Sequence, residues 1–128
     1  MRWVAYLDDN EMLRQLVQEL VESVLGVRCL TAGTLDDFKN IILSEPPVSL
    51  AILDINLGVA QPTGIDAFHW LRAQGMQEPI FFLTGYSESD PLVKDAGKLG
   101  VPIFEKPMQT KIFLERLRES LKLSSPPL

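Results

Sequence analysis

Acidic side chains occur at two places in this chain where an apolar segment ends. Asp8 and Asp9 follow the apolar segment Trp3–Leu7, and Asp54 closes the segment Leu50–Asp54, whose other four residues are all apolar. A buried parallel strand is typically a continuous run of hydrophobic residues, so a carboxylate at the end of such a run indicates a possible functional role. Aspartate is also common in turns, and Asp54 alone is therefore compatible with a purely structural role.

Two further strand-like segments also end in polar groups. The segment "PIFFLTG" (79–85) carries Thr84 near its end, and "VPIFE" (101–105) is followed directly by Lys106 and Pro107. The remaining segment, which ends at Ala32, is not followed directly by a charged residue, and its end has the sequence "TAG" (31–33). Four of the five apolar segments thus deliver a carboxylate, a hydroxyl or an ammonium group at the same end.

Brought together, these groups favour phosphoryl chemistry with a divalent cation. Crowded carboxylates repel one another and hold protons unless a cation compensates them. Oxygen ligands with room for water suit Mg²⁺, which typically uses one or two carboxylates. The Lys106 ammonium and the Thr84 hydroxyl would contact phosphoryl oxygens. Asp54, central between the acid pair and these two residues, is the candidate nucleophile.

Five apolar segments alternate with five amphipathic helical patterns. The predicted strands are Trp3–Leu7, Val27–Ala32, Leu50–Asp54, Pro79–Gly85 and Val101–Glu105. The first helix has an apolar face and a stop at Gly26; the face comprises Leu13, Leu16, Val17, Leu20, Val21 and Val24. The other helices begin at Thr34 (with Asp37 three residues on), near Gly64, at Asp90–Pro91 and near Thr110.

Strict alternation of this kind predicts an α/β fold, a (βα)5 doubly wound parallel sheet with helices on both faces. The strand order that gathers the four polar ends is 2-1-3-4-5, the flavodoxin-like order, and ligands bind where such an order reverses. The early Pro102 suggests that the fifth strand lies at a sheet edge. We expect one domain over residues 1–123, with 124–128 ("SSPPL") as a tail or the start of a linker.

Composition narrows the class of protein further. The chain has 128 residues, 46% hydrophobic and 23% charged, which suits a single globular domain. Its net charge of −5 argues against direct binding of nucleic acid. Because no apolar run is long enough to cross a membrane and Cys29 is the only cysteine, we expect a cytoplasmic protein without membrane contact. Cys29 itself is expected to be a buried core residue.

The combination Asp8-Asp9, Asp54, Thr84 and Lys106-Pro107 closely resembles the site of a response-regulator receiver domain, and the resemblance extends from Arg2 to about Leu123. Each motif alone is weak, but the four occur in order, each at the end of its own predicted strand. The resemblance implies a two-component switch. A histidine kinase or a histidine phosphotransfer protein would donate a phosphoryl group to Asp54.

The resemblance also assigns roles to the surrounding residues. Asp9, Asp54 and the backbone carbonyl of Asn56 would hold Mg²⁺, with Asp8 acting through water. Lys106 would pair with the phosphoryl group and Thr84 would move toward it. The signal would pass to an output domain or a downstream protein through the fourth helix, the fifth strand and the fifth helix, by shifting an existing equilibrium.

Three features depart from the pattern of that family. Ile103 occupies the position where receivers usually carry an aromatic switch residue, and Phe104 beside it should face the opposite side of the sheet. The loop 56–63 is longer than usual, and we expect a neutral insertion rather than a loop that reshapes access to the site. Asn56 and Tyr86 occupy positions that line the path of the attacking water, and the bulk of Tyr86 predicts slow loss of the phosphoryl group.

Other functions remain open from the residues alone. A haloacid-dehalogenase-like phosphatase also uses an aspartate nucleophile and Mg²⁺, but it would have a second carboxylate where this chain has Asn56. An FMN-binding flavodoxin would not have the acidic "DDNEM" (8–12) after its first strand. A phosphorylation-independent interaction module of the same fold is the third alternative. His69 is expected to face solvent or to pack within its helix, and Trp3 and Trp70 are candidate markers of a contact surface.

Overall fold

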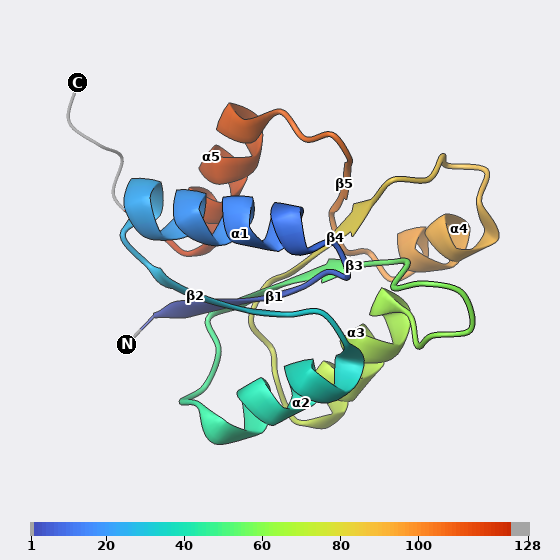
Figure 1. Cartoon of the computed structure of the whole chain (residues 1–128), viewed down its shortest axis with the longest axis horizontal. Coiled ribbons are helices and arrows are strands. Elements are labelled where there is room, and N and C mark those ends of the chain that lie inside the picture. Colours follow the sequence, from blue (N-terminus) through green and yellow to red (C-terminus); the bar gives the residue numbers. More distant parts are fainter. Residues whose placement is uncertain (1, 124–128) are drawn as a thin grey trace.

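The computed structural model describes residues 2–123 and contains one five-stranded parallel sheet (Figure 1). The strands are β1 (Trp3–Leu7), β2 (Arg28–Ala32), β3 (Leu50–Asp54), β4 (Ile80–Thr84) and β5 (Ile103–Glu105). The strand order β2-β1-β3-β4-β5 confirms the predicted doubly wound flavodoxin-like fold. The predicted tail 124–128 lies outside the described residues, and the domain boundary at residue 123 stays a prediction.

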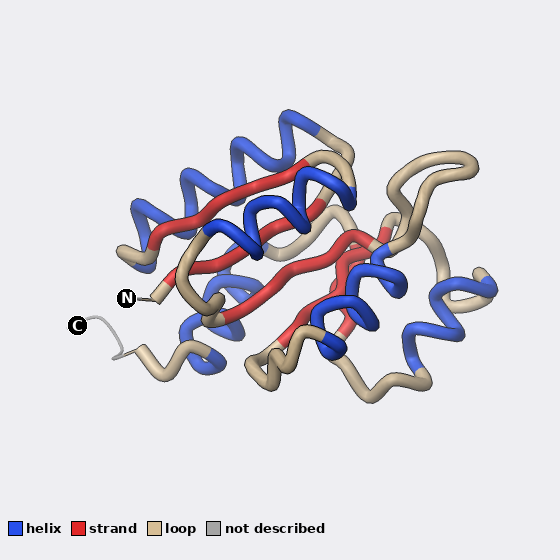
Figure 2. Tube along the Cα trace, turned by 90° about the horizontal axis from the view of Figure 1, so that it is seen from below, coloured by secondary structure: helices blue, strands red, loops and turns tan. Residues whose placement is uncertain are grey.

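Helices cover both faces of the sheet (Figures 1 and 2). They are α1 (Glu11–Leu20) with its π-helical continuation η1 (Val21–Leu25), α2 (Leu35–Ser44), α3 (Gly64–Ala73), α4 (Pro91–Gly97) and α5 (Thr110–Ser120). The helices α1, η1 and α5 pack on one face, and α2, α3 and α4 on the other. Within residues 2–123, no helix is both long and apolar enough to cross a bilayer.

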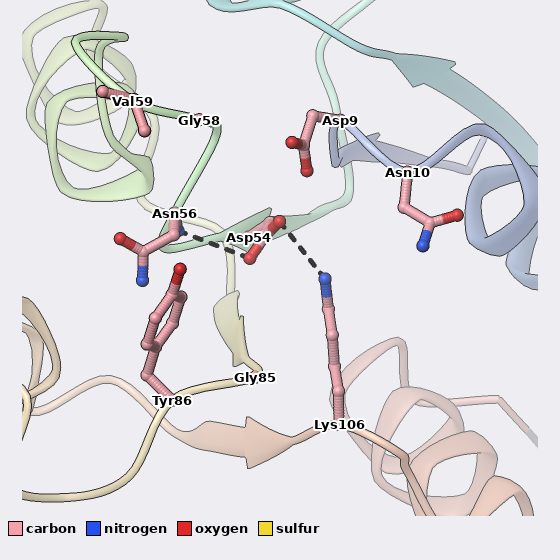
Figure 3. A pocket seen from close by; sticks show the side chains of 9 residues that line it. All are labelled: Asp9, Asn10, Asp54, Asn56, Gly58, Val59, Gly85, Tyr86 and Lys106. Atoms are coloured by element: carbon pink, nitrogen blue, oxygen red, sulfur yellow. Dashed lines mark hydrogen bonds and ion pairs between the residues drawn. The ribbon is translucent and has the colours of Figure 1, made fainter.

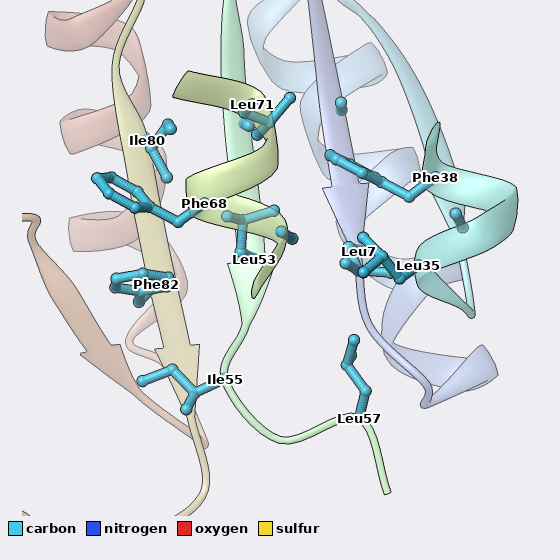
Figure 4. Packing of buried hydrophobic residues seen from close by; sticks show 14 of the residues in the cluster. Leu7, Leu35, Phe38, Leu53, Ile55, Leu57, Phe68, Leu71, Ile80 and Phe82 are labelled. Atoms are coloured by element: carbon cyan, nitrogen blue, oxygen red, sulfur yellow. The ribbon is translucent and has the colours of Figure 1, made fainter. Parts of the chain in front are cut away.

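Successive side chains of β1 point alternately into two separate hydrophobic cores, one on each face of the sheet. Trp3, Ala5 and Leu7 belong to the core beneath α2 and α3, whereas Val4 and Tyr6 belong to the core beneath α1 and α5. Figure 4 shows Leu7 beside Leu35 of α2 in the first of these cores. All five side chains are buried because β1 is a central strand covered on both faces.

Trp3 does not mark a contact surface, and the hypothesis is wrong for that residue, whereas for Trp70 it stays a prediction. Trp3 is only 1% exposed, and its Nε1–H donates to the Pro46 carbonyl at 2.8 Å. Trp70 is half-buried against the α2–α3 core, with the Lys39 ammonium 5.6 Å from its ring centroid. His69, in contrast, is exposed as expected and lies against the edge of the Phe68 ring.

The first helix buries fewer apolar side chains than its sequence pattern predicted. Leu16 and Val24 are about half exposed, contrary to the prediction, while Val17, Val21 and Leu25 are buried. The π-helical turn explains the exposure of Val24. In this wider turn the residue that lies on the same face as Val21 is Leu25, and Val24 points away from the core.

The edge strand β2 is protected by side chains of α1 and η1. Gln18 Nε2–H donates to the Cys29 carbonyl at 2.9 Å, and the Cys29 N–H donates to Glu22 Oε2 at 3.1 Å. Exposed strand edges invite pairing with another chain, so these bonds close one such edge. Burial, and then the charge of Glu22, raise the pKa of the Cys29 thiol to about 12. Cys29 is therefore the buried core residue that we expected.

Local signals set the bounds of the other elements. Thr34 and Asp90 cap α2 and α4 through their side chains, as predicted, and Asn10 caps α1 in the same way. Thr63 and Asp66 form a complete capping box at the start of α3 that the sequence pattern did not reveal to us. The strand β5 lies at the sheet edge, as Pro102 indicated, although it begins two residues later than predicted.

Candidate functional site

The carboxyl ends of β1, β3, β4 and β5 form one rim, and Asp54 lies at its centre (Figure 3). A solvent-accessible pocket of about 390 Å³ opens above Asp54. Its lining residues are Asp9, Asn10, Asp54, Asn56, Gly58, Val59, Gly85, Tyr86 and Lys106. The Asp54 residue itself is only 3% exposed. The sheet therefore brings together the residues that the sequence placed at the strand ends.

Lys106 bridges two of the three acids. Its Nζ lies 2.8 Å from Asp8 Oδ2 and 3.2 Å from Asp54 Oδ2. Burial opposes the charge on the lysine, but the hydrogen bond to Asp8 and the charges of both acids outweigh it. The pKa of Lys106 is consequently raised above its ordinary value, and the side chain is a fixed cation at the base of the pocket.

The protonation of Asp54 reflects a balance of opposing effects. Burial is the largest of them, and together with the negative charge of Asp8 it raises the pKa of Asp54 to about 7. The positive charge of Lys106 acts in the opposite direction. A carboxylate in this position gains a great deal from an added cation, since the cation would favour its charged form.

Asp8 is completely buried and is held by several donors. The Tyr6 hydroxyl donates to Asp8 Oδ2 at 2.5 Å, and the Asn10 N–H donates to Asp8 Oδ1 at 2.9 Å. Arg14 Nη1–H donates to the backbone carbonyl of Asp8 at 2.7 Å. Burial, and then Asp8, raise the pKa of Tyr6 well above its ordinary value, so the phenol remains a donor.

Sequence reasoning missed Tyr6 and Arg14. Tyr6 precedes Asp8 by two residues, so strand alternation places both on one side of the sheet, and that spacing was the available signal. Arg14 carries no comparable signal, because an arginine on a surface helix ordinarily faces water.

The three acids are suitably placed to bind a metal ion together. Each of Asp8, Asp9 and Asp54 offers a carboxylate oxygen, and these oxygens lie within 4.8 Å of one another. Asp9 is exposed and projects over the pocket (Figure 3). This set of hard oxygen donors matches the preference of Mg²⁺. Because Asp8 already accepts bonds from Tyr6, Lys106 and Asn10, Asp9 and Asp54 are the freer ligands.

Thr84 and Tyr86 occupy the β4 side of the site. Thr84 is 1% exposed, and its Oγ1 accepts the Tyr86 N–H at 3.0 Å, while its carbonyl accepts the Lys106 N–H at 2.8 Å. Thr84 is thus adjacent to the pocket but does not line it. Tyr86 lines the pocket and is 53% exposed, with its ring across the opening from Asp9 (Figure 3).

Asn56 and its loop form the remaining wall. The Asn56 N–H donates to Asp54 Oδ1 at 3.4 Å, and the Asn56 Nδ2 is buried without a hydrogen-bond partner among the described residues. Gly58 and Val59 of the same loop also line the pocket. The structure thus corrects the expectation of a neutral insertion, because three residues of the loop line the pocket that contains Asp54.

Ile103 and Phe104 face opposite sides of β5, as predicted. Ile103 is half-buried against the α2–α3 core. Phe104 lies on the other side, 5.3 Å from the Phe81 ring and 5.4 Å from the Phe113 ring between centroids, with Arg116 over its own ring. Neither residue lines the pocket around Asp54. Residue 103, which lies on the face of β5 that packs toward α4, is therefore aliphatic and not aromatic.

The family model of the response regulator receiver domain matches residues 4–118. The chain therefore belongs to the response-regulator receiver family of two-component signal transduction, as the strand-end residues predicted. It is 29% identical over 119 residues to the response regulator protein TodT of Pseudomonas putida, covering 92% of this chain and 50% of that protein. It is 28% identical over 125 residues to the transcriptional regulatory protein TctD of Salmonella typhimurium, and the match covers 98% of this chain and 54% of TctD. The chain spans about half the length of these curated relatives.

Solved structures support the same fold. A response regulator receiver protein from Burkholderia phymatum superposes with a TM-score of 0.79 at 22% identity, over 99% of this chain and 100% of the other. The BeF3-activated N-terminal receiver domain of RstA from Klebsiella pneumoniae gives a TM-score of 0.78 at 24% identity, over 94% and 99%.

Proposed function

We propose that this chain accepts a phosphoryl group on Asp54 from a phosphohistidine of a histidine kinase or a phosphotransfer protein. An Asp54 carboxylate oxygen attacks phosphorus, the P–N bond of the phosphohistidine breaks, and the imidazole nitrogen takes up a proton. The observation that carries the proposal is the convergence of three carboxylates and one lysine at a single rim, with Asp54 at the centre of an open pocket.

Mg²⁺ would supply positive charge that offsets repulsion between Asp54 and the incoming phosphoryl oxygens. The residues that would hold it are Asp9, Asp54 and the backbone carbonyl of Asn56, with Asp8 acting through water. Lys106 already contacts Asp54 and would transfer to a phosphoryl oxygen. The Thr84 hydroxyl would leave the Tyr86 N–H and donate to another phosphoryl oxygen.

Phosphorylation would alter the surface formed by α4, β5 and α5. Its charge and acceptors would draw Thr84 and Lys106, at the ends of β4 and β5, toward Asp54. An output domain or a downstream protein would read this surface. The relatives support this part of the proposal, because they are about twice as long as this chain and include a transcriptional regulatory protein.

Acetyl phosphate, a small phosphodonor, tests the proposal without a cognate kinase. Incubation with Mg²⁺ should add one phosphoryl group, seen by intact-mass spectrometry, and EDTA or the Asp54→Asn substitution should abolish the adduct. Asp36→Asn, which removes an exposed acid from α2, is the matched control and should leave the adduct unchanged. An adduct of the same yield in Asp54→Asn would remove Asp54 from its proposed role.

Tyr86 is expected to prolong the life of the phosphorylated state. Its ring lines the pocket opposite Asp9 and would restrict the approach of water to Asp54. Tyr86→Ala should therefore accelerate hydrolysis several-fold, whereas Tyr86→Phe, which keeps the ring, should stay close to the wild-type rate. The measurement is the decay of the phosphorylated mass after removal of the donor. Equal rates in all three proteins would contradict this role.

A further inference from the structure

The phenol of Tyr6 reaches the acidic cluster from inside the protein. Tyr6 is fully buried in the core beneath α1 and α5, among apolar neighbours such as Ile52 and Leu83. An apolar side chain would satisfy such a position without any partner, whereas a buried phenol requires one. The partner that the structure provides is Asp8 Oδ2.

The same oxygen of Asp8 serves both Tyr6 and Lys106. Asp8 Oδ2 accepts the Tyr6 hydroxyl and the Lys106 ammonium, while Oδ1 accepts the Asn10 N–H. The contact from Lys106 Nζ to Asp8, 2.8 Å, is shorter than its contact to Asp54, 3.2 Å. In this state the ammonium is therefore shared between the two acids, with the shorter bond to Asp8.

Transfer of Lys106 to a phosphoryl group would leave Asp8 buried without its cation. A buried carboxylate that loses a donor is strongly disfavoured unless other donors remain. With Tyr6 present, Asp8 would keep the phenol and the Asn10 N–H. Without the phenol, Asp8 would keep only the backbone N–H among these donors and would hold Lys106 more tightly.

We propose that Tyr6 is a positioning residue for phosphorylation, because its hydroxyl stabilises Asp8 when Lys106 moves toward the group bound to Asp54. This inference rests on the proposed function, since it concerns the movement of Lys106 during the same reaction. Tyr6 does not line the pocket and would act only through Asp8.

Two affinities of the Tyr6→Phe variant distinguish this role from a general loss of structure. On this proposal beryllofluoride, a phosphoryl mimic, draws Lys106 away from Asp8, whereas Mg²⁺ alone leaves the contact between Lys106 and Asp8 in place. We expect beryllofluoride affinity at saturating Mg²⁺ to fall about tenfold, as for loss of one charge-assisted hydrogen bond, and Mg²⁺ affinity to change less than about twofold. Both are measured by NMR titration of the whole chain.

Ile52→Val is the matched control. Ile52 pairs with Tyr6 in the β1–β3 register and is buried in the same core, but its shortening removes no polar contact. The control should lower the unfolding temperature slightly and leave both affinities unchanged. A parallel fall of both affinities in Tyr6→Phe, or an unchanged beryllofluoride affinity, would overturn the role of Tyr6. Failure of the wild-type chain to bind beryllofluoride with Mg²⁺ would instead overturn the proposed function itself.

Discussion

Gly64→Ala should unfold the protein or nearly so. A Cβ atom at Gly64 would overlap the Asp54 carbonyl oxygen and lie 3.0 Å from Ile55 Cα, and both are backbone atoms that no side-chain rotation can move away. The Gly64 N–H also donates to the Ile55 carbonyl at 2.9 Å, which fixes the start of α3 against the end of β3. We expect a loss of about 3 kcal/mol or more in the free energy of unfolding, the range of severe core changes.

Gly97→Ala is the control for the Gly64 substitution. Gly97 ends α4, and an added Cβ would meet no atom within 4 Å. Because alanine favours helix over glycine by up to about 1 kcal/mol, Gly97→Ala should be neutral or slightly stabilising. Urea unfolding followed by circular dichroism measures both variants. Equal stabilities of the two variants would show that α3 does not pack on β3 as closely as described.

Asp54→Asn should stabilise the metal-free protein at neutral and alkaline pH. The pKa of Asp54 is raised to about 7 in the folded chain, against an ordinary value near 3.8, mainly by burial and by Asp8. The folded state therefore binds this proton more tightly than the unfolded state does. The stability that the bound proton contributes is complete below the unfolded pKa and is lost as the pH rises through about 7.

The asparagine variant does not lose this contribution, so its advantage over wild type should grow with pH. We expect similar stabilities near pH 4 and an advantage of about 2–4 kcal/mol at pH 8, since each pKa unit corresponds to about 1.4 kcal/mol. Urea unfolding in EDTA across this pH range is the measurement, with Asp36→Asn as the control for one lost negative charge. An advantage independent of pH would contradict the described burial of the Asp54 charge.

The sequence predicted the fold because local and long-range signals agreed. Each strand is a short apolar run and each of the first four helices has a cap or a stop, so alternation alone led to the parallel sheet. The same logic located Asp54, Thr84 and Lys106, because parallel strands end at a common rim. Fold and family are confirmed by the strand order and by the family model over residues 4–118.

The sequence pattern failed where a side chain depends on a partner far along the chain. Trp3 reads as an exposed strand opening, but Pro46, 43 residues away, accepts its indole N–H. Val24 fits an α-helical period, but a π-helical turn moves it into solvent. In the sequence Tyr6 is indistinguishable from the apolar core residues around it. Its hydrogen bond to Asp8 becomes evident only in the folded structure.

Chemical mapping of the phosphorylated residue tests the central claim most directly. An aspartyl phosphate is an acyl phosphate, which borohydride reduces to homoserine, whereas a phosphohistidine does not react in this way. After phosphorylation with acetyl phosphate and Mg²⁺, reduction and peptide sequencing by mass spectrometry should place homoserine at position 54. Homoserine at Asp8 or Asp9 instead, or a phosphoryl group retained on His69, would contradict the account.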